Sequence, residues 1–335
     1  MKQVVATALV LLLLLFLLPS VFITPQPSPG EEQLPAGTLP PVHTPAPTTP
    51  TAASDAQTTV QVAMEDGSVA ALTMDEYLWG VVAAEMPVSF ALEALKAQAV
   101  AARTYTVAKM GHTVQAHPDA QVCTDITCCQ AYITRQTALE NWGDRGAEYA
   151  EKITQAVAGT DGMILTYQGD PIQAVFFSSA AGKTVDAVEV WGSDVPYLSS
   201  VDSPEGEEVP NYHSTVELSL SEFQQTLLAE YPNMALTGDP AGWVGEVAQN
   251  SAGGVASMTI GGVSVSGTTL RALFNLRSTT FTLTLSADKA VFSVTGYGHG
   301  VGMSQYGANA MANQGKTWRD IVTWYYTGVE VVPMG

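Results

Sequence analysis

The N-terminal part of the chain restricts a compact fold to the residues that follow it. Val4–Ile23 is a 20-residue, mainly apolar run, and apart from Lys2 no charged side chain precedes Glu31. A helix of that length spans about 30 Å, the thickness of the hydrocarbon core of a bilayer. A cleaved signal peptide shares the positive start and apolar centre, but a small-residue cleavage site is missing. We therefore favour a transmembrane anchor over residues 1–23.

Residues 24–57 predict a disordered, extended linker rich in Pro and Thr. Nine of the 19 prolines lie between Pro25 and Pro50, and the segment contains no Lys or Arg. Such a composition buries too little apolar area to offset the entropy of ordering. The basic start of the chain favours the cytoplasmic side, so we expect a single-pass protein of the cell membrane whose folded domain, residues 58–335, lies outside the cytoplasm.

Charge excludes one class of partner. The chain has 13 Lys and Arg against 32 Asp and Glu, a formal net charge of −19. A field of that sign repels polyanions, so nucleic acid is not an expected partner. Three cysteines are also too few for a disulfide-stapled scaffold, and an odd number cannot all pair within the chain.

The folded part combines two hydrophobic periodicities. Turn residues between short β-prone runs predict hairpins, and apolar residues at helical spacing between capping signals predict helices. We expect an α+β fold, with helices and hairpins forming one large cleft-bearing domain. The expected hairpins cover residues 59–73, 163–177, 258–265 and 281–294, and the expected helices cover residues 75–85, 89–110, 304–313 and 318–326.

Glu85 is the candidate for acid chemistry. It falls in the last turn of an apolar helix, which ends at Met86 because Pro87 disfavours helical geometry in the residue before it. The negative end of the helix dipole and the apolar neighbours both disfavour an ionised carboxylate, which predicts a raised pKa for Glu85. A carboxyl that stays protonated near neutrality suits the general acid of glycosidic cleavage. The alternative is an ordinary helix-end Glu with its carboxylate in water.

Lys96 and Arg103 are candidates for binding an anionic substrate group. They lie seven residues apart, two helical turns, and so share a face of the predicted helix. The alternative is a solvated helix edge on which Glu93 and Lys96 pair.

A group of four soft ligands predicts a metal site. His117, Cys123, Cys128 and Cys129 lie within thirteen residues and hold all the cysteines of the chain. Four such ligands complete a tetrahedral zinc site without an open position, which is typical of structural zinc. A disulfide from Cys123 to Cys128 or Cys129 is the alternative, but it would leave one thiol over.

A glycine-rich segment, residues 296–303, surrounds His299. Its spacing does not match the G-x-G-x-x-G pattern of dinucleotide-binding loops, and we interpret it as a place of close backbone approach to a ligand or another segment. Tyr197, Tyr297 and Tyr306 are candidate sugar-stacking surfaces, with core packing as the alternative. The Ser178–Ser179 pair has no histidine nearby in the sequence, and neither G-x-S-x-G nor H-E-x-x-H occurs.

Several longer stretches point to one family. The chain contains, in order, VVAAEMP, EALKAQAVAARTY, CTDITCCQAY, FFSSAAGKT, VWGSDVPYLSSV, GYGHGVGMSQYGANAMANQGKTW and IVTWYY. These stretches extend over nearly all of residues 58–326 and resemble the stage II sporulation protein D family, which is related to the amidase-enhancer domain of cell-wall lytic systems. Residues 203–256 match least well and suggest a variable insertion.

The resemblance implies a sporulation enzyme of the cell wall. It implies a lytic transglycosylase that cleaves the MurNAc–GlcNAc bond of peptide-stripped glycan strands and forms 1,6-anhydro-MurNAc during septal wall remodelling and engulfment. It further implies a partner amidase, a membrane scaffold of the engulfment machinery, and a location in the intermembrane space of the sporulating cell. A non-catalytic activator of an N-acetylmuramoyl-L-alanine amidase and a hydrolytic glycosidase are the alternatives.

The resemblance also assigns roles to residues. It places the catalytic carboxylate at Glu85. The sequence offers no second carboxylate with comparable support, and Asp125 is the nearest rival. The resemblance places structural zinc at His117, Cys123, Cys128 and Cys129, although this chain has Cys128 where the family has histidine. The expected substrate-binding residues are Lys96, Arg103, Ser178, Tyr197, His299, Gln305 and Tyr306. We expect Lys96 or Arg103 to pair with the lactyl carboxylate that stripped glycan exposes.

Overall fold

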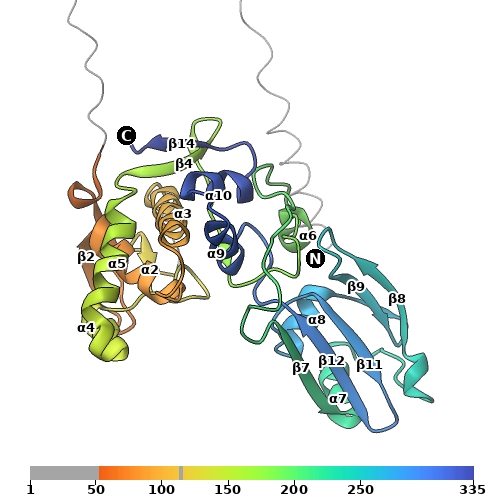
Figure 1. The fold of residues 1–335 in the computed structure, drawn as a ribbon. Helices are drawn as coiled ribbons and strands as arrows, with labels where there is room; N and C mark the ends of the chain where they lie inside the picture. The colour runs from red at the N-terminus through yellow and green to blue at the C-terminus, as the bar shows by residue number, and fades with distance from the viewer. Residues whose placement is uncertain (1–52, 113–115) are drawn as a thin grey trace, which may run out of the picture. The chain divides into compact units, whose positions relative to one another are not determined.

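The computed structural model describes residues 53–112 and 116–335, coloured along the chain in Figure 1. Its helices are η1 (Asp55–Gln57), α2 (Met74–Glu85), α3 (Leu92–Met110), α4 (Arg135–Trp142), η2 (Gly143–Arg145), α5 (Gly146–Ala158), α6 (Ala187–Trp191), α7 (Leu220–Glu230), η3 (Pro240–Gly242), α8 (Gly267–Leu273), α9 (Gln305–Asn313) and α10 (Trp318–Tyr325). The predicted anchor over residues 1–23 and most of the predicted linker lie outside the described residues. None of the described helices is both long and apolar enough to cross a bilayer.

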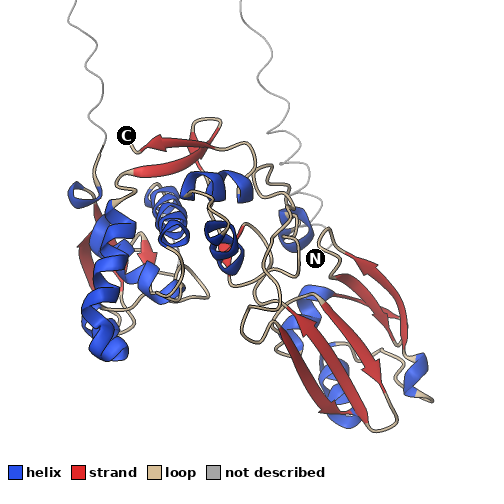
Figure 2. Cartoon of the chain, in the orientation of Figure 1, coloured by secondary structure: helices blue, strands red, loops and turns tan. Residues whose placement is uncertain are grey.

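The strands are short and distributed over several sheets (Figure 2). They are β1 (Thr59–Ala63), β2 (Val69–Thr73), β3 (Val122–Cys123), β4 (Met163–Tyr167), β5 (Asp170–Pro171), β6 (Phe176–Phe177), β7 (His213–Ser219), β8 (Val244–Gln249), β9 (Val255–Ile260), β10 (Val263–Ser266), β11 (Phe281–Leu285), β12 (Lys289–Thr295), β13 (Met303–Ser304) and β14 (Glu330–Pro333). Within the described ranges they pair in the orders β2-β1-β3, β14-β4-β5, β13-β6, β11-β12-β7 and β10-β9-β8. This confirms the predicted α+β class.

Local turn chemistry predicted three of the four hairpins. β1 pairs with β2, β9 with β10 and β11 with β12, each in antiparallel register. The prediction for residues 163–177 was wrong in its second half. β4 pairs with the two-residue β5, whereas β6 leaves the hairpin and pairs in parallel with β13, far along the chain. No local signal specifies that long-range pairing.

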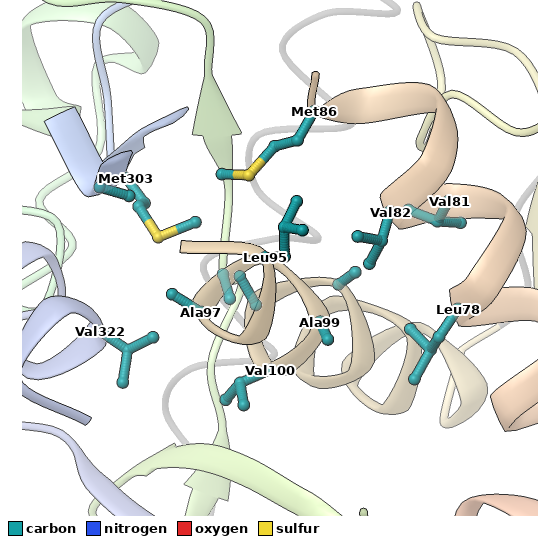
Figure 3. Packing of buried hydrophobic residues seen from close by; sticks show 14 of the residues in the cluster. Leu78, Val81, Val82, Met86, Leu95, Ala97, Ala99, Val100, Met303 and Val322 are labelled. Carbon is teal, nitrogen blue, oxygen red and sulfur yellow. The ribbon is translucent and has the colours of Figure 1, made fainter. Parts of the chain in front are cut away.

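The described residues enclose two hydrophobic cores rather than the single core expected for one domain. The first contains α2, α3, α5, α9 and α10, and Figure 3 shows part of it, with Leu95 of α3 between Met86 and Val100. The second is built from β7 to β12 with α7 and α8, centred on the stacked rings of Phe223 and Phe274, 5.2 Å apart. Residues 203–256 contribute β7, α7 and β8 to this second core.

The long helix α3 is buried on most of its circumference. Small residues such as Ala97, Ala99 and Ala101 are fully buried and let α2, α5, α9 and α10 approach closely. The helix begins later than predicted, because Ser89 lies in a turn in which Phe90 N–H donates to the Pro87 carbonyl, and Ala91 occupies the N-cap position.

Arg103 of α3 is a structural residue, which corrects its expected role in substrate binding. Its guanidinium is fully buried and binds Asp55 through Nε–Oδ1 at 2.7 Å and Nη2–Oδ2 at 2.6 Å. Its remaining donors contact Thr160 and the carbonyls of Val157 and Met163. Asp55 is also buried, so the folded part begins before the predicted boundary at residue 58.

The buried pair yields a stability prediction. Asp55→Ala leaves an uncompensated charge on buried Arg103, and we expect the free energy of unfolding to fall by about 3–5 kcal/mol. The matched control is Glu148→Ala, which breaks an exposed pair with Arg145 and leaves stability nearly unchanged. Urea unfolding of the variants measures both effects. A loss for Asp55→Ala as small as that of the control would contradict the structural role.

Candidate active site

A cavity of about 730 Å³ brings together residues from distant parts of the sequence. Its wall combines the end of α2, the loop after β3, the β6 region, α6, α8 and the glycine-rich segment before β13. The lining residues are Glu85, Tyr105, Ile126, Thr127, Cys128, Cys129, Gln130, Ala131, Val175, Phe176, Phe177, Ser178, Trp191, Arg271, Tyr297, Gly298, His299 and Gln305. Glu85 is the only carboxylate among them.

Glu85 is held at the wall of the cavity by two donors. Helix α2 ends there as predicted, since Met86 adopts an extended conformation before Pro87. One carboxylate oxygen accepts a hydrogen bond from Ala131 N–H at 2.7 Å, and the other accepts one from the Gln305 side-chain amide at 3.2 Å. Burial raises the pKa of Glu85 and outweighs the lowering effect of these two hydrogen bonds. The geometry thus favours the protonated acid, as the sequence predicts.

Gln305 is fixed at the first turn of α9. Its amide contacts Gln98 of α3 at 3.5 Å as well as Glu85. The preceding Ser304 caps α9 by accepting a hydrogen bond from Gly307 N–H. At Gly302, which has a φ of +78°, a Cβ would lie 2.2 Å from the Val175 carbonyl oxygen, so the approach of β13 to the β6 region requires glycine.

A buried carboxylate, Glu205, supports the same region. It accepts hydrogen bonds from Ala180 N–H and the Ser203 hydroxyl, each at 2.6 Å, and from the Ser304 hydroxyl. These bonds join the segment after β6 to the start of α9. Glu205 therefore positions the backbone that carries Ser178 and Gln305 rather than lining the cavity. The sequence contains no motif that singles it out.

His299 lines the cavity as a neutral ring. Nδ1 accepts a hydrogen bond from Val301 N–H at 3.2 Å, which leaves Nε2 to donate to the Phe176 carbonyl at 3.0 Å. Burial lowers the pKa of His299 to about 4 against the opposing effect of the Phe176 carbonyl, and the charge of Arg271 lowers it further. Because backbone groups occupy both nitrogens, the ring can supply a surface but not a proton.

The four predicted metal ligands lie together. The nitrogen of His117 and the three cysteine sulfurs are all within 4.8 Å of one another. His117 Nε2 is 3.6 Å from Cys128 Sγ and 3.5 Å from Cys129 Sγ, and the two sulfurs are 3.8 Å apart. His117 Nδ1 donates to the Ala120 carbonyl at 3.0 Å, which directs Nε2 toward the sulfurs. The three cysteines are free thiols, not disulfide-bonded.

This arrangement fits a tetrahedral metal ion. With Zn–S bonds of about 2.3 Å and a Zn–N bond of about 2.0 Å, tetrahedral angles place sulfurs about 3.8 Å apart and nitrogen about 3.5 Å from sulfur. The three spacings among His117, Cys128 and Cys129 agree with those values, and the whole set lies within 4.8 Å. Four protein ligands leave no open position, so a metal bound here would order the loop rather than contact substrate.

The metal cluster and Glu85 are linked through the chain itself. Cys128 and Cys129 are followed directly by Gln130 and by Ala131, whose N–H binds Glu85. Gln130 is buried, and its amide donates to Tyr77 and Thr106 at 3.3 Å each. The cluster thus determines where the donor to Glu85 lies.

The cavity includes half of the expected catalytic and substrate-binding residues. Glu85, Ser178, His299 and Gln305 line it. The others lie elsewhere. Lys96 pairs with Glu93 at 2.7 Å. This contact supports the alternative interpretation, a helix edge on which these two residues pair. Arg103 is buried against Asp55, as described above.

Two tyrosines expected at the substrate pack instead against the first core. Tyr197 lies 5.6 Å from the ring of Tyr167 and accepts a hydrogen bond from Gln173 N–H. Tyr306 contacts Phe90 edge-to-face at 4.9 Å. Neither lines the cavity, so core packing explains both.

Sequence reasoning did not assign Tyr105, Trp191 or Arg271 to the site. Tyr105 lies on α3 and donates to the Cys128 carbonyl at 3.3 Å. Trp191 ends α6, and its ring lies 5.8 Å from that of His299. Arg271 comes from α8 of the second core. Trp191 lies in the stretch VWGSDVPYLSSV, one of those that resemble the family, whereas Arg271 lies in none of them.

Comparison with known proteins decides the family. A family model described as stage II sporulation protein matches residues 64–167, which include Glu85 and the four cluster residues. Stage II sporulation protein D of Bacillus amyloliquefaciens is 42% identical over 266 residues, which cover 79% of this chain and 75% of that protein. The chain belongs to the stage II sporulation protein D family. The protein of the same name from Bacillus subtilis strain 168 is 41% identical over 266 residues, 79% of this chain and 76% of the relative.

A second kind of relative is also similar. The amidase enhancer of Bacillus subtilis strain 168 is 32% identical over 302 residues, which cover 75% of this chain and 39% of that longer protein. Membership in the family places this chain among sporulation proteins.

The metal cluster yields a prediction about its ligands. We expect purified protein to contain about one zinc ion per chain and Cys128→Ser to lose most of it, because one of four ligands is weakened. The control is Ile126→Ser, at an exposed position of the same loop that offers no ligand. Metal analysis by mass spectrometry measures the content. Unchanged zinc in Cys128→Ser would remove Cys128 from the ligand set.

Proposed function

We propose that this protein is a lytic transglycosylase that cleaves the MurNAc–GlcNAc bond of peptide-stripped peptidoglycan. The observation that carries the proposal is Glu85, a carboxyl with a raised pKa at the wall of a cavity large enough for sugar residues. Family membership supports a cell-wall substrate.

The chemistry requires one group that first gives and then accepts a proton. Glu85 donates its proton to the glycosidic oxygen, and the bond from C1 of muramic acid to that oxygen breaks. The resulting carboxylate accepts the proton of the C6 hydroxyl of the same sugar, whose oxygen bonds to C1 and closes a 1,6-anhydro ring. No water is consumed, and Glu85 returns to its starting form.

The composition of the cavity favours this reaction over hydrolysis. A water-using glycosidase normally employs two carboxyl groups about 5 to 9.5 Å apart. Among the described lining residues, Glu85 has no carboxylate partner. The expected rival, Asp125, is outside this lining.

Exposed rings provide a surface for sugars. Trp191 and Tyr297 line the cavity and are 47% and 46% exposed, an unusual degree for large aromatic side chains. Aromatic faces pack well against the apolar faces of sugar rings while the hydroxyls stay hydrated. These two residues replace Tyr197 and Tyr306 in the proposed binding surface.

The metal would act at a distance from the reaction. Bound by His117 and the three cysteines, zinc would supply structural order to the loop that ends at Ala131. The residues of this chain then perform the remaining tasks: Ala131 N–H and the Gln305 amide orient the carboxyl of Glu85.

The setting of the reaction is part of the proposal. The apolar run over residues 1–23 would anchor the chain in the cell membrane, and the proline-rich linker would let the domain reach glycan strands outside the cytoplasm. In the sporulating cell this space lies between two membranes. A partner amidase would supply stripped strands, and a membrane scaffold would hold the enzymes together.

Similarity to the amidase enhancer supports a second candidate function, that of a non-catalytic activator of an amidase. The two functions differ in products. An activator alone releases no sugar from purified stripped glycan, whereas a transglycosylase releases anhydro-muramic ends and a hydrolase releases reducing ends.

The proposal predicts the effect of one isosteric change. Glu85→Gln keeps an acceptor for Ala131 N–H but has no proton to donate, and we expect release of anhydro-muramic products to fall at least 1,000-fold, within the roughly 10²–10⁴-fold range of acid–base catalysis. The control is Glu246→Gln, at an exposed position of β8. Mass spectrometry of digests of stripped glycan measures the rate. Anhydro-muramic release at the unmodified rate from folded, metal-loaded Glu85→Gln would refute the mechanism.

A further inference from the structure

One cation in the cavity has no partner. Arg271 of α8 lines the same cavity as Glu85, yet it forms no ion pair within the described ranges. Its Nε–H is buried and finds no acceptor among the described residues. A buried donor without an acceptor is costly, which favours a bound ligand as the source of the acceptor.

The neighbours of Arg271 do not neutralise it. His299 is neutral and contacts backbone groups through both nitrogens. A second guanidinium, that of Arg277, stacks on one face of the Tyr297 ring at 4.1 Å from its centroid. Gly298 N–H donates to the Arg277 carbonyl at 2.9 Å, which ties the glycine-rich segment to the chain after α8. This wall of the cavity is therefore cationic in a chain of strongly negative net charge.

We propose that Arg271 is a specificity-determining residue that binds a carboxylate of the substrate in the Glu85 cavity. This inference rests on the proposed function, in which the carboxylate is that of the lactyl group of muramic acid. In peptide-bearing strands that group is an amide, which carries no charge. In stripped strands it is a free carboxylate, which a guanidinium binds through two parallel hydrogen bonds.

This assignment replaces the expectation for Lys96 and Arg103. Both of those cations already have carboxylate partners within the fold, Glu93 and Asp55 respectively. Arg271 lines the cavity and has no carboxylate partner among the residues that the structure describes. Selection for stripped strands thus comes from the second core, while the acid comes from the first.

Binding of chemically matched strands tests the proposal without turnover. Full-length, metal-loaded protein carrying Glu85→Gln is titrated with stripped glycan strands and with the same strands after conversion of the lactyl carboxylates to methyl amides. A charge-assisted hydrogen bond contributes about 1.5–3 kcal/mol, so we expect the carboxylate form to bind roughly tenfold or more tightly. Arg271→Gln in that background reduces this preference to near unity.

Two further variants make the test decisive. Lys289→Gln removes one exposed positive charge from β12 and keeps the preference, which excludes a general charge effect. Arg271→Lys retains the positive charge but lacks the planar guanidinium, and we expect it to keep part of the preference for the carboxylate form. It serves as the test variant if Arg271→Gln does not fold.

The outcomes separate this inference from the proposed function. Equal binding of the two strand forms by the parent, or an undiminished preference in Arg271→Gln, overturns the role of Arg271. Loss of the preference supports it. If the unmodified protein then releases no anhydro-muramic ends, the transglycosylase proposal fails while carboxylate recognition by Arg271 stands.

Discussion

The hydrogen bond from Ala131 N–H to Glu85 joins the two halves of the candidate site. It is 2.7 Å long and connects the end of α2 to the loop that carries Cys128 and Cys129. Only Gln130 separates the last cluster cysteine from this donor, so a shift of the cluster moves the donor. A metal held by four protein ligands is a suitable way to fix such a loop, because it needs no regular secondary structure.

The cavity combines electrostatic features that oppose one another in water. Burial raises the pKa of Glu85 and lowers that of His299, while Arg271 remains a cation without a carboxylate partner in the described structure. An acid that pairs with a nearby cation would ionise, so the fold must keep the two functions apart. Although both residues line the cavity, they form no ion pair with each other in the described structure, and they lie on α2 and α8, which pack in different hydrophobic cores.

The sequence predicted correctly those features that depend on residues close to one another along the chain. Pro87 ended α2 at Glu85, turn residues defined three hairpins, and close spacing in the sequence brought Cys123 together with Cys128 and Cys129. The misplaced residues depend on long-range partners. Arg103 pairs with a residue 48 positions away, in a segment whose composition resembled a linker.

The same reason explains what sequence reasoning missed. The contact of Gln305 with Glu85 spans 220 positions, and only the resemblance to a family indicated Gln305 at all. Arg271 stands in a short helix without a motif, and its role follows only from the cavity that it lines. Residues 203–256 matched the family least well, yet they help build the second core that positions Arg271.

The central claim is that burial raises the pKa of Glu85, and titration of this group tests the claim most directly. Carbon NMR of carboxyl-labelled glutamate, with Glu85→Gln to assign the signal, follows the protonation of this single group in metal-loaded protein. The account predicts a pKa above the ordinary value of 4.5 for a glutamate, so that the acid form persists as the pH rises toward neutrality. A pKa at or below that value would contradict it.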